Sequence, residues 1–368
     1  MSLTTILQNK DMRKLFTEEF KKPKIQLEGE IKAEPITYNY AEVGTAFDKG
    51  IALIIAHCCG LHVLTNPYFC RYNFKKCKIT KIYMKSIGKN LINKVHNLFS
   101  FLTVSSLFIA MTGFSVPFFS FLLYGISVDF GLLFASSFIT FAVYSINKLT
   151  DIKEDSINLV DRAKFTNKNR HYLIISIIIS SFAALYLSLL YSIFAIFVIF
   201  FPFFVGLVYS IKIANFRFKD IICIKSISVA LAWAVCGTFI PVIVHSFDIL
   251  IIYSIFFFIF VKMFINTVLF DIRDIEADML NNVITIPVFL GVNKTKKLLL
   301  LLNSTLIIWV IFSYTFFHIF FLILIFSVVY GYWYILYLTK EGIKIGKSID
   351  LLLDGEFTMI AILILLFF

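Results

Sequence analysis

Long apolar stretches separated by short connecting segments dominate most of this chain. From residue 96 onward, each stretch approaches the ~20 residues with which an α-helix crosses a bilayer. The stretches lie near 96–114, 131–149, 171–189, 191–208, 224–243, 248–269, 298–313, 317–337 and 349–368. The pattern therefore predicts an all-α polytopic membrane protein with nine transmembrane helices.

Composition supports this class of protein and argues against a soluble domain. Of the 368 residues, 59% are hydrophobic and only 15% are charged, and 44 are phenylalanine. A single soluble core needs far less apolar material than this, whereas a polytopic membrane protein needs it to face both lipid and neighbouring helices. We therefore expect an integral protein of the cell membrane.

The basic residues fix an expected orientation. Lysine and arginine gather in the segments that follow the second, fourth, sixth and eighth stretches, while the intervening turns near 115–130, 190, 244–247 and 314–316 contain none. Because cytoplasmic loops are enriched in these residues, the first set of segments should face the cytoplasm. The C-terminus should then lie outside.

Two clusters of oxygen-bearing side chains follow the second and sixth stretches. In each cluster the residues recur three or four positions apart, so a continuing helix would place them on one face; they are Asn147, Asp151 and Asp155, and Asp271, Asp274 and Asp278. Mg²⁺ prefers oxygen ligands and is typically held by one or two carboxylates together with substrate phosphates. Both clusters are expected at the cytoplasmic side, where they indicate diphosphate chemistry.

The order of stretches and clusters repeats along the chain. Four stretches with a cluster after the second (96–208) precede four more with the same arrangement (224–337), and a ninth follows. We expect one helical bundle around a central cavity with both clusters at the same mouth. Residues 95–368 would form this domain. Residues 1–94 would form a cytoplasmic arm, with a short interfacial apolar segment at 51–65 and a basic juxtamembrane stretch at 70–94 that contacts lipid headgroups rather than nucleic acid.

The two aspartate motifs resemble those of the UbiA-type intramembrane prenyltransferases. Further matches are Asn158, Arg162, Tyr209, Lys212, the Thr285-Ile-Pro287 segment and Gly291, whereas Lys148 stands where many members carry a second acid. The resemblance covers roughly residues 95–368. It implies nine transmembrane helices and Mg²⁺-dependent transfer of a prenyl group from its diphosphate to an aromatic or lipid-like acceptor, with release of diphosphate.

The resemblance also implies roles for individual residues. Metal ligands would be Asn147, Asp151, Asp155, Asp271, Asp274 and Asp278, among which Asp151, Asp155, Asp271 and Asp274 would be catalytic. The diphosphate would be bound by Asn147, Arg162, Tyr209, Lys212, Lys219 and Arg273. Charge accumulates on the leaving diphosphate as the C–O bond breaks, and fixed cations stabilise it.

Two other functions remain open at this point. A CDP-alcohol phosphotransferase also uses membrane-embedded aspartates, and a transporter can use intramembrane acids within repeated halves. Three further ionisable residues lie inside apolar stretches, where they tend to face a cavity or each other; they are Lys262, Asp354 and Glu356. The sequence does not assign these three to the metal site.

Overall fold

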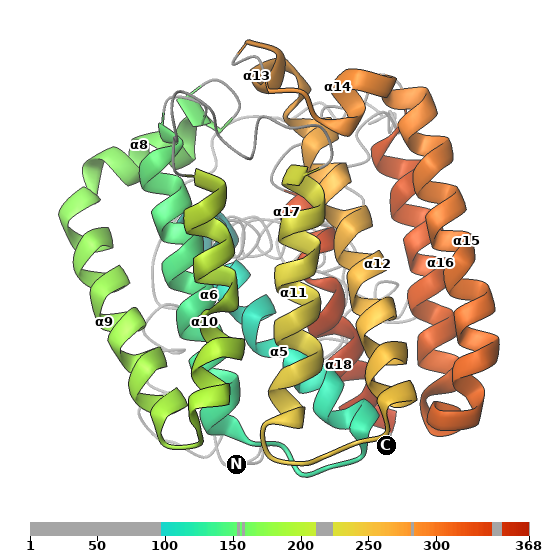
Figure 1. Cartoon of the computed structure of the whole chain (residues 1–368). Helices are drawn as coiled ribbons and strands as arrows, with labels where there is room; N and C mark the ends of the chain where they lie inside the picture. Colours follow the sequence, from blue (N-terminus) through green and yellow to red (C-terminus); the bar gives the residue numbers. More distant parts are fainter. Residues whose placement is uncertain are drawn as a thin grey trace, which may run out of the picture. The chain divides into compact units, whose positions relative to one another are not determined.

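The computed structural model describes residues 97–152, 155–156, 159–210, 224–280, 283–340 and 348–367. These residues form helices and no strands (Figure 1). After a helical segment at 97–104, the first half comprises α5 (Leu107–Tyr124), α6 (Phe130–Thr150), α8 (Val160–Lys168), α9 (Arg170–Leu189) and α10 (Ile193–Ser210). The predicted interfacial segment and basic stretch before residue 95 lie outside the described residues.

The second half repeats the pattern of long helices joined by short ones. Its elements are α11 (Ile224–Val242), α12 (Ile249–Arg273), α13 (Ile275–Leu280), α14 (Ile286–Leu290), α15 (Val292–Phe317), the 3₁₀ turn η4 (His318–Phe320), α16 (Phe321–Leu338), α17 (Ser348–Leu353) and α18 (Glu356–Phe367). In Figure 1, α6 and α12 both end at the side where α8 and α13 lie. The residues that follow these two helices therefore meet at one end of the bundle.

Six stretches within the described residues are long and apolar enough to cross a membrane. Five coincide with α5, α6, α9, α11 and α12, and the sixth is a 47-residue stretch, Val292–Leu338, that contains both α15 and α16. Two more helices, at Ile193–Gly206 and Glu356–Leu366, are apolar but shorter. The described residues thus support a polytopic all-helical protein, while the predicted number of nine transmembrane helices is not confirmed.

Two of the predicted stretches are interrupted. The first, near 96–114, breaks at Ser105 and Ser106, where Ser106 adopts the left-handed conformation at φ 70°. Helix α5 then continues to Tyr124. Most of the turn predicted near 115–130 is therefore helical. The last stretch breaks at Asp354 and Gly355, between α17 and α18, where a Cβ on Gly355 would lie only 2.3 Å from the Leu351 carbonyl oxygen, so the close backbone approach at this break requires glycine. Hydropathy is insensitive to such breaks, since apolar residues continue on both sides.

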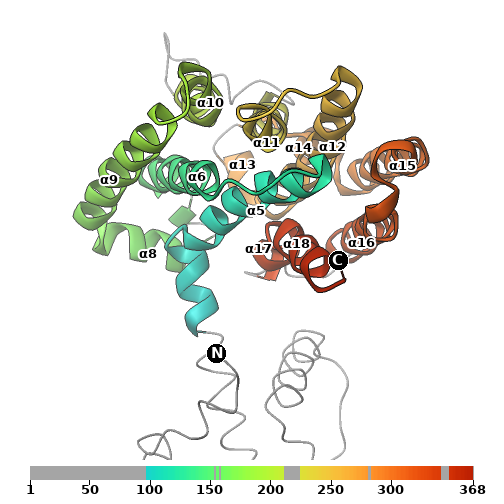
Figure 2. The same cartoon turned by 90° about the horizontal axis from the view of Figure 1, so that it is seen from below.

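Close helix contacts are made where small residues meet. Helix α5 packs against α6, α11 and α18, and Figure 2 shows it crossing between α6 and the second half. A Cβ on Gly113 of α5 would lie 2.4 Å from Thr140 Oγ1 on α6, so the two backbones approach closely only because this residue is glycine. Small residues at helix crossings are typical of membrane bundles.

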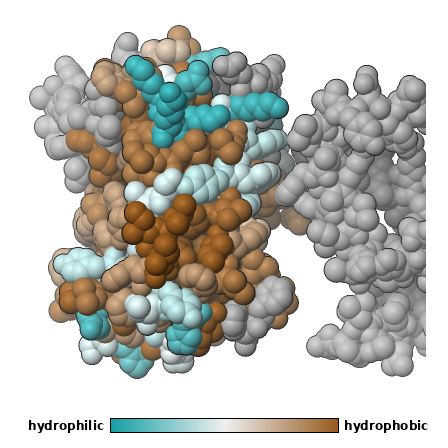
Figure 3. Space-filling view, turned by 90° about the vertical axis from the view of Figure 1, so that its right-hand side faces the viewer, coloured by the Kyte–Doolittle hydropathy of each residue, from teal (hydrophilic) through white to brown (hydrophobic). Residues whose placement is uncertain are grey.

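Large apolar side chains cover the outer surface. On the face seen in Figure 3, hydrophobic residues form a band between more hydrophilic ends. Contributors on α15 and α16 include Ile308, Ile311 and Leu322, which are 72%, 68% and 76% exposed. A band of this kind suits contact with lipid tails, so the long apolar helices indicate an integral membrane protein.

A fully buried ion pair connects three helices of the second half. Lys262 Nζ on α12 lies 2.5 Å from Glu356 Oε1 on α18 and donates a hydrogen bond to the Ser327 carbonyl oxygen on α16. Ser327 Oγ and the Tyr334 hydroxyl also donate to Glu356. Lys262 and Glu356 therefore neutralise each other. Of the two arrangements that the sequence left open for these residues, facing a cavity or facing each other, the structure shows the second.

Candidate active site

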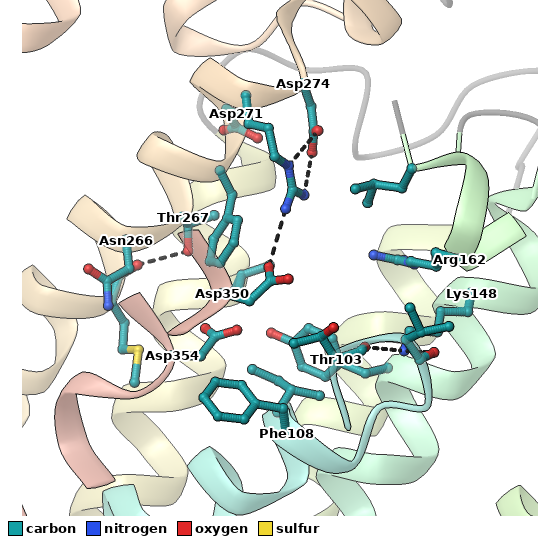
Figure 4. A pocket seen from close by; sticks show the side chains of 18 of the residues that line it. Thr103, Phe108, Lys148, Arg162, Asn266, Thr267, Asp271, Asp274, Asp350 and Asp354 are labelled. Atoms are coloured by element: carbon teal, nitrogen blue, oxygen red, sulfur yellow. Dashed lines mark hydrogen bonds and ion pairs between the residues drawn. The ribbon is translucent and has the colours of Figure 1, made fainter. Parts of the chain in front are cut away.

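A pocket of about 450 Å³ opens where α6, α11 and α12 approach one another (Figure 4). It is rich in charged side chains, which come from both halves of the chain: Lys148, Asp161, Arg162, Lys225, Asp271, Arg273, Asp274, Asp350 and Asp354. Aromatic residues complete the wall, among them Phe108, Tyr144, Trp233 and Phe270. Such a pocket can hold a molecule with one strongly charged end and one apolar end.

The second aspartate cluster is held by the first turn of α11. Asp271, in the last turn of α12, is 1% exposed, accepts a 2.7 Å hydrogen bond from Ser226 Oγ and forms a 2.8 Å ion pair with Lys225 Nζ. The same ammonium group lies 3.5 Å from Asp278 Oδ2 on α13. The positive charge of Lys225 therefore lies between two carboxylates of the cluster.

Arg273 orients the third carboxylate of this cluster. Its guanidinium group donates to both Asp274 oxygens at 2.9 and 3.0 Å and lies 3.3 Å from Asp350 Oδ1 on α17. Bidentate pairing of this type is short and directional. It also lowers the pKa of Asp274: burial alone would raise it, but the adjacent Arg273 charge outweighs burial. Asp274 is therefore ionised at neutral pH.

The first cluster lies at the end of α6. Asp151 is the C-terminal cap of that helix, its backbone N–H donates to the Asn147 carbonyl oxygen, and Thr150 Oγ1 donates to its carboxylate at 3.1 Å. Asp155 is 7% exposed and forms a 2.8 Å ion pair with Arg162 Nε. Because Arg162 lines the pocket, this pair joins the first cluster to it.

Lys148 serves a structural purpose in this wall. Its ammonium group is buried and donates hydrogen bonds to the carbonyl oxygens of Thr103 and Val104, at 3.1 and 2.7 Å. These carbonyls end the helical segment 97–104, just before the turn at Ser106, where helix carbonyls lack backbone partners. Lys148 therefore stabilises the break in the first apolar stretch.

The expected site residues are distributed unevenly around the pocket. Arg162, Asp271, Arg273 and Asp274 line it, and Asp155 and Asp278 contact residues that do. Asn147 instead lines a neighbouring pocket of about 100 Å³, and Asp151 is not in the lining of either. The side chains of Tyr209, Lys212 and Lys219 lie outside the described residues.

Several residues of the site were not assigned to it from the sequence, among them Lys225, Ser226 and Asp350. Lys225 and Ser226 lie in the first turn of the apolar helix α11, and Asp350 precedes the last apolar helix, α18. Lys225 belongs to a basic connecting segment, which was interpreted only as an orientation signal. Its pairing with Asp271 requires that the start of α11 and the end of α12 adjoin, as expected for consecutive antiparallel helices. For Asp350, the signal in the sequence was its spacing of four residues from Asp354.

The described residues form an all-helical membrane protein with a charged pocket, which residues of the second aspartate cluster line and Asp155 of the first reaches through Arg162. The chain belongs to the UbiA prenyltransferase family, whose family model matches residues 97–344. It is similar in structure to a UbiA homolog from Archaeoglobus fulgidus bound to GPP and Mg²⁺, with a TM-score of 0.56 and 20% identity over 72% of this chain and 95% of that one.

A structure of a UbiA homolog from Archaeoglobus fulgidus bound to DMAPP and Mg²⁺ is also similar, with a TM-score of 0.49 and 18% identity over 73% of this chain and 99% of that one. No curated protein sequence matches the chain. The resemblance predicted from the two aspartate motifs is thus confirmed at the level of the family.

The ligands available suit Mg²⁺ bound together with a diphosphate. No three His, Cys, Asp or Glu side chains among the described residues gather in a way that would by itself hold a metal ion. The donors are carboxylate oxygens, and Mg²⁺ needs only one or two of these when phosphate oxygens and water complete its shell. These carboxylates form ion pairs with basic residues: Asp271 with Lys225, Asp155 with Arg162 and Asp274 with Arg273.

Proposed function

We propose that this protein transfers a prenyl group from a prenyl diphosphate to an aromatic or lipid-like acceptor within the membrane, with Mg²⁺ as cofactor. The supporting observation is the convergence of Asp271, Asp274, Arg162 and Arg273 on one pocket in a chain of the UbiA prenyltransferase family. The proposal includes nine transmembrane helices around a central cavity, an N-terminal arm at 1–94 and a prenyltransferase domain at 95–368.

The charged residues of the pocket would bind the diphosphate, and its aromatic residues would surround the prenyl group. Bound Mg²⁺ would stabilise the negative charge that develops on the leaving diphosphate. Arg162 and Lys225 would exchange their carboxylate partners for phosphate oxygens, and Asn147, Tyr209, Lys212 and Lys219 are proposed to assist them. The aromatic walls would exclude water from the allylic cation until the acceptor attacks.

Binding and turnover of a prenyl diphosphate test this function directly. The purified protein should be stabilised against heat by geranyl diphosphate only when Mg²⁺ is present, and membranes that contain it should transfer labelled prenyl groups to an acceptor. Stabilisation by a CDP-alcohol instead would favour a phosphotransferase. Absence of any Mg²⁺-dependent stabilisation by geranyl or dimethylallyl diphosphate would refute the proposal.

The affinity for Mg²⁺ should fall as the pH is lowered through about 6. Burial raises the pKa of Asp155 and of Asp278 to about 6 each, although Arg162 and Lys225 respectively oppose this effect. Below that pH the two carboxyl groups become protonated, and Mg²⁺ must displace their protons. We expect about a tenfold loss of affinity per pH unit for each proton displaced. Mn²⁺ titrations between pH 5 and 8 would measure it, and a flat profile would contradict the pKa shifts.

The pocket mouth is proposed to face the cytoplasm, with the C-terminus outside. In a background without the native cysteines, single cysteines in place of Phe165 and Asn293 should react with an impermeant thiol reagent only from the cytoplasmic side. A cysteine in place of Ser246 should react only from outside. The expectation follows from the Lys and Arg asymmetry of the connecting segments. Labelling of the first two from opposite sides would refute it.

A further inference from the structure

One carboxylate in the pocket lies apart from the two aspartate clusters. Asp354 occupies the break between α17 and α18, and its side chain faces the pocket at the end where Phe108 lies (Figure 4). Within the described part of the chain its carboxylate makes no hydrogen bond and no ion pair. The neighbouring acids differ, since Asp350 is paired with Arg273 and Glu356 with Lys262.

The backbone around Asp354 is held on both sides. Thr112 Oγ1 of α5 donates a 2.8 Å hydrogen bond to the Asp354 carbonyl oxygen. Asn266 Nδ2 of α12 donates one of 3.3 Å to the carbonyl oxygen of Leu353. These bonds satisfy carbonyl groups that the helix break leaves without helical partners. They also fix the position from which the Asp354 side chain extends into the pocket.

A second oxygen on the same wall lacks a donor. Asn266 is 3% exposed and lines the pocket, and its Oδ1 atom has no hydrogen-bond partner among the described residues. A buried acceptor without a donor destabilises a folded protein, because its desolvation is not compensated by a hydrogen bond. Ionisable groups at membrane depth likewise need a partner. The Asp354 carboxylate and the Asn266 Oδ1 atom, in a pocket also lined by Phe108, Ile109 and Met263, therefore indicate an apolar ligand that carries a hydrogen-bond donor.

We propose that Asp354 binds the hydroxyl group of the acceptor and takes its proton during transfer. This inference rests on the proposed function and specifies its second substrate as an alcohol or phenol. The bond between the prenyl C1 and the diphosphate oxygen breaks, and the diphosphate leaves with the electron pair. The acceptor oxygen then bonds to C1, and its proton passes to the Asp354 carboxylate. The product is a prenyl ether.

Matched pairs of hydroxyl compounds and their methyl ethers test the recognition step. With Mg²⁺ and a non-reactive geranyl thiolodiphosphate, the affinities of 4-hydroxybenzoate and a 1-O-alkylglycerol are compared with those of their O-methylated forms. We expect about tenfold or larger preference for the hydroxyl form in at least one pair, because its ether cannot donate to the carboxylate. Equal affinity within both pairs, including binding of neither member, would overturn the inference.

Two variants separate recognition from a structural role. Asp354→Asn should lose the hydroxyl preference and slow transfer by about 10²–10⁴-fold, the range expected when a general base is removed. Its affinity for geranyl diphosphate with Mg²⁺ should stay within about threefold of wild type. Asp354→Glu should restore part of the rate. Asp248→Asn is the matched control, because Asp248 is the N-cap of α12, at the end opposite to Asp271, and asparagine can also serve as an N-cap.

Three results would contradict this assignment, and each differs from a failure of the proposed function. They are wild-type transfer rates in Asp354→Asn, prenyl products linked through carbon instead of oxygen, and loss of one bound Mn²⁺ in Asp354→Asn, which would make Asp354 a metal ligand. Failure of wild-type protein to bind geranyl diphosphate with Mg²⁺ would instead refute prenyl transfer itself.

Discussion

Replacement of Asp271 by alanine is expected to reduce prenyl transfer by about 10³-fold or more while the protein still inserts into the membrane. Asp271 is held by Ser226 and Lys225, so its carboxylate is fixed toward the pocket. Its loss would remove a ligand that stabilises the leaving diphosphate through Mg²⁺. Turnover of labelled geranyl diphosphate in membranes measures the effect, with Asp248→Asn as the control.

The same substitution at Asp151 tests whether both clusters take part. We expect a comparable loss, because the family resemblance implies metal ligands in both clusters. Asp151 lies at the end of α6 outside the pocket lining, so this variant is the sharper test of the residue roles implied by the family. Near-wild-type turnover of either variant in excess Mg²⁺ would rule out the two-cluster site.

Replacement of Glu356 by leucine should destabilise the protein by about 3–5 kcal/mol, since it leaves the Lys262 ammonium buried without its counter-charge. Both side chains are 0% exposed. The double variant Lys262→Met/Glu356→Leu removes both charges at similar volume and should recover most of the loss. Unfolding transitions of the two variants in detergent, measured with wild type under identical conditions, give the comparison.

An equal loss in the single and double variants would show that the ion pair is not the source of the effect. In that case the packing of Ser327 and Tyr334 around Glu356 would carry the stability of this region. Prenyl diphosphate binding by the double variant provides a second measurement. It should match wild type, because neither Lys262 nor Glu356 lines the pocket.

The sequence predicted the class of fold because apolar length is a direct consequence of bilayer thickness. It also located the aspartates at helix ends, since Asp151 and Asp271 follow apolar stretches immediately. The breaks at Ser106 and Gly355 could not be predicted, because they depend on contacts from other helices. Lys148 caps the first break from α6, and Thr112 and Asn266 hold the second from α5 and α12.

Only those parts of the candidate site whose residues lie a few positions apart in the sequence could be predicted. Spacing placed Asp271 and Asp274 together, and both line the pocket. It also grouped Asn147 with Asp151, yet the structure turns Asn147 toward the neighbouring small pocket. The pairing of Lys225 with Asp271, and of Arg273 with Asp350, joins residues that are far apart in the sequence. Such pairings follow from tertiary packing and leave no local pattern.

The charges in the pocket have a consequence for the order in which substrates arrive. Among its described lining residues, five are acidic and four are basic, so together they carry no net positive charge that would attract an anion. A free prenyl diphosphate is strongly negative and would meet Asp271, Asp274 and Asp350 on arrival. The cation should therefore enter before the diphosphate or already bound to it. Rapid mixing without Mg²⁺ should accordingly show slow, weak association that accelerates once the metal is supplied.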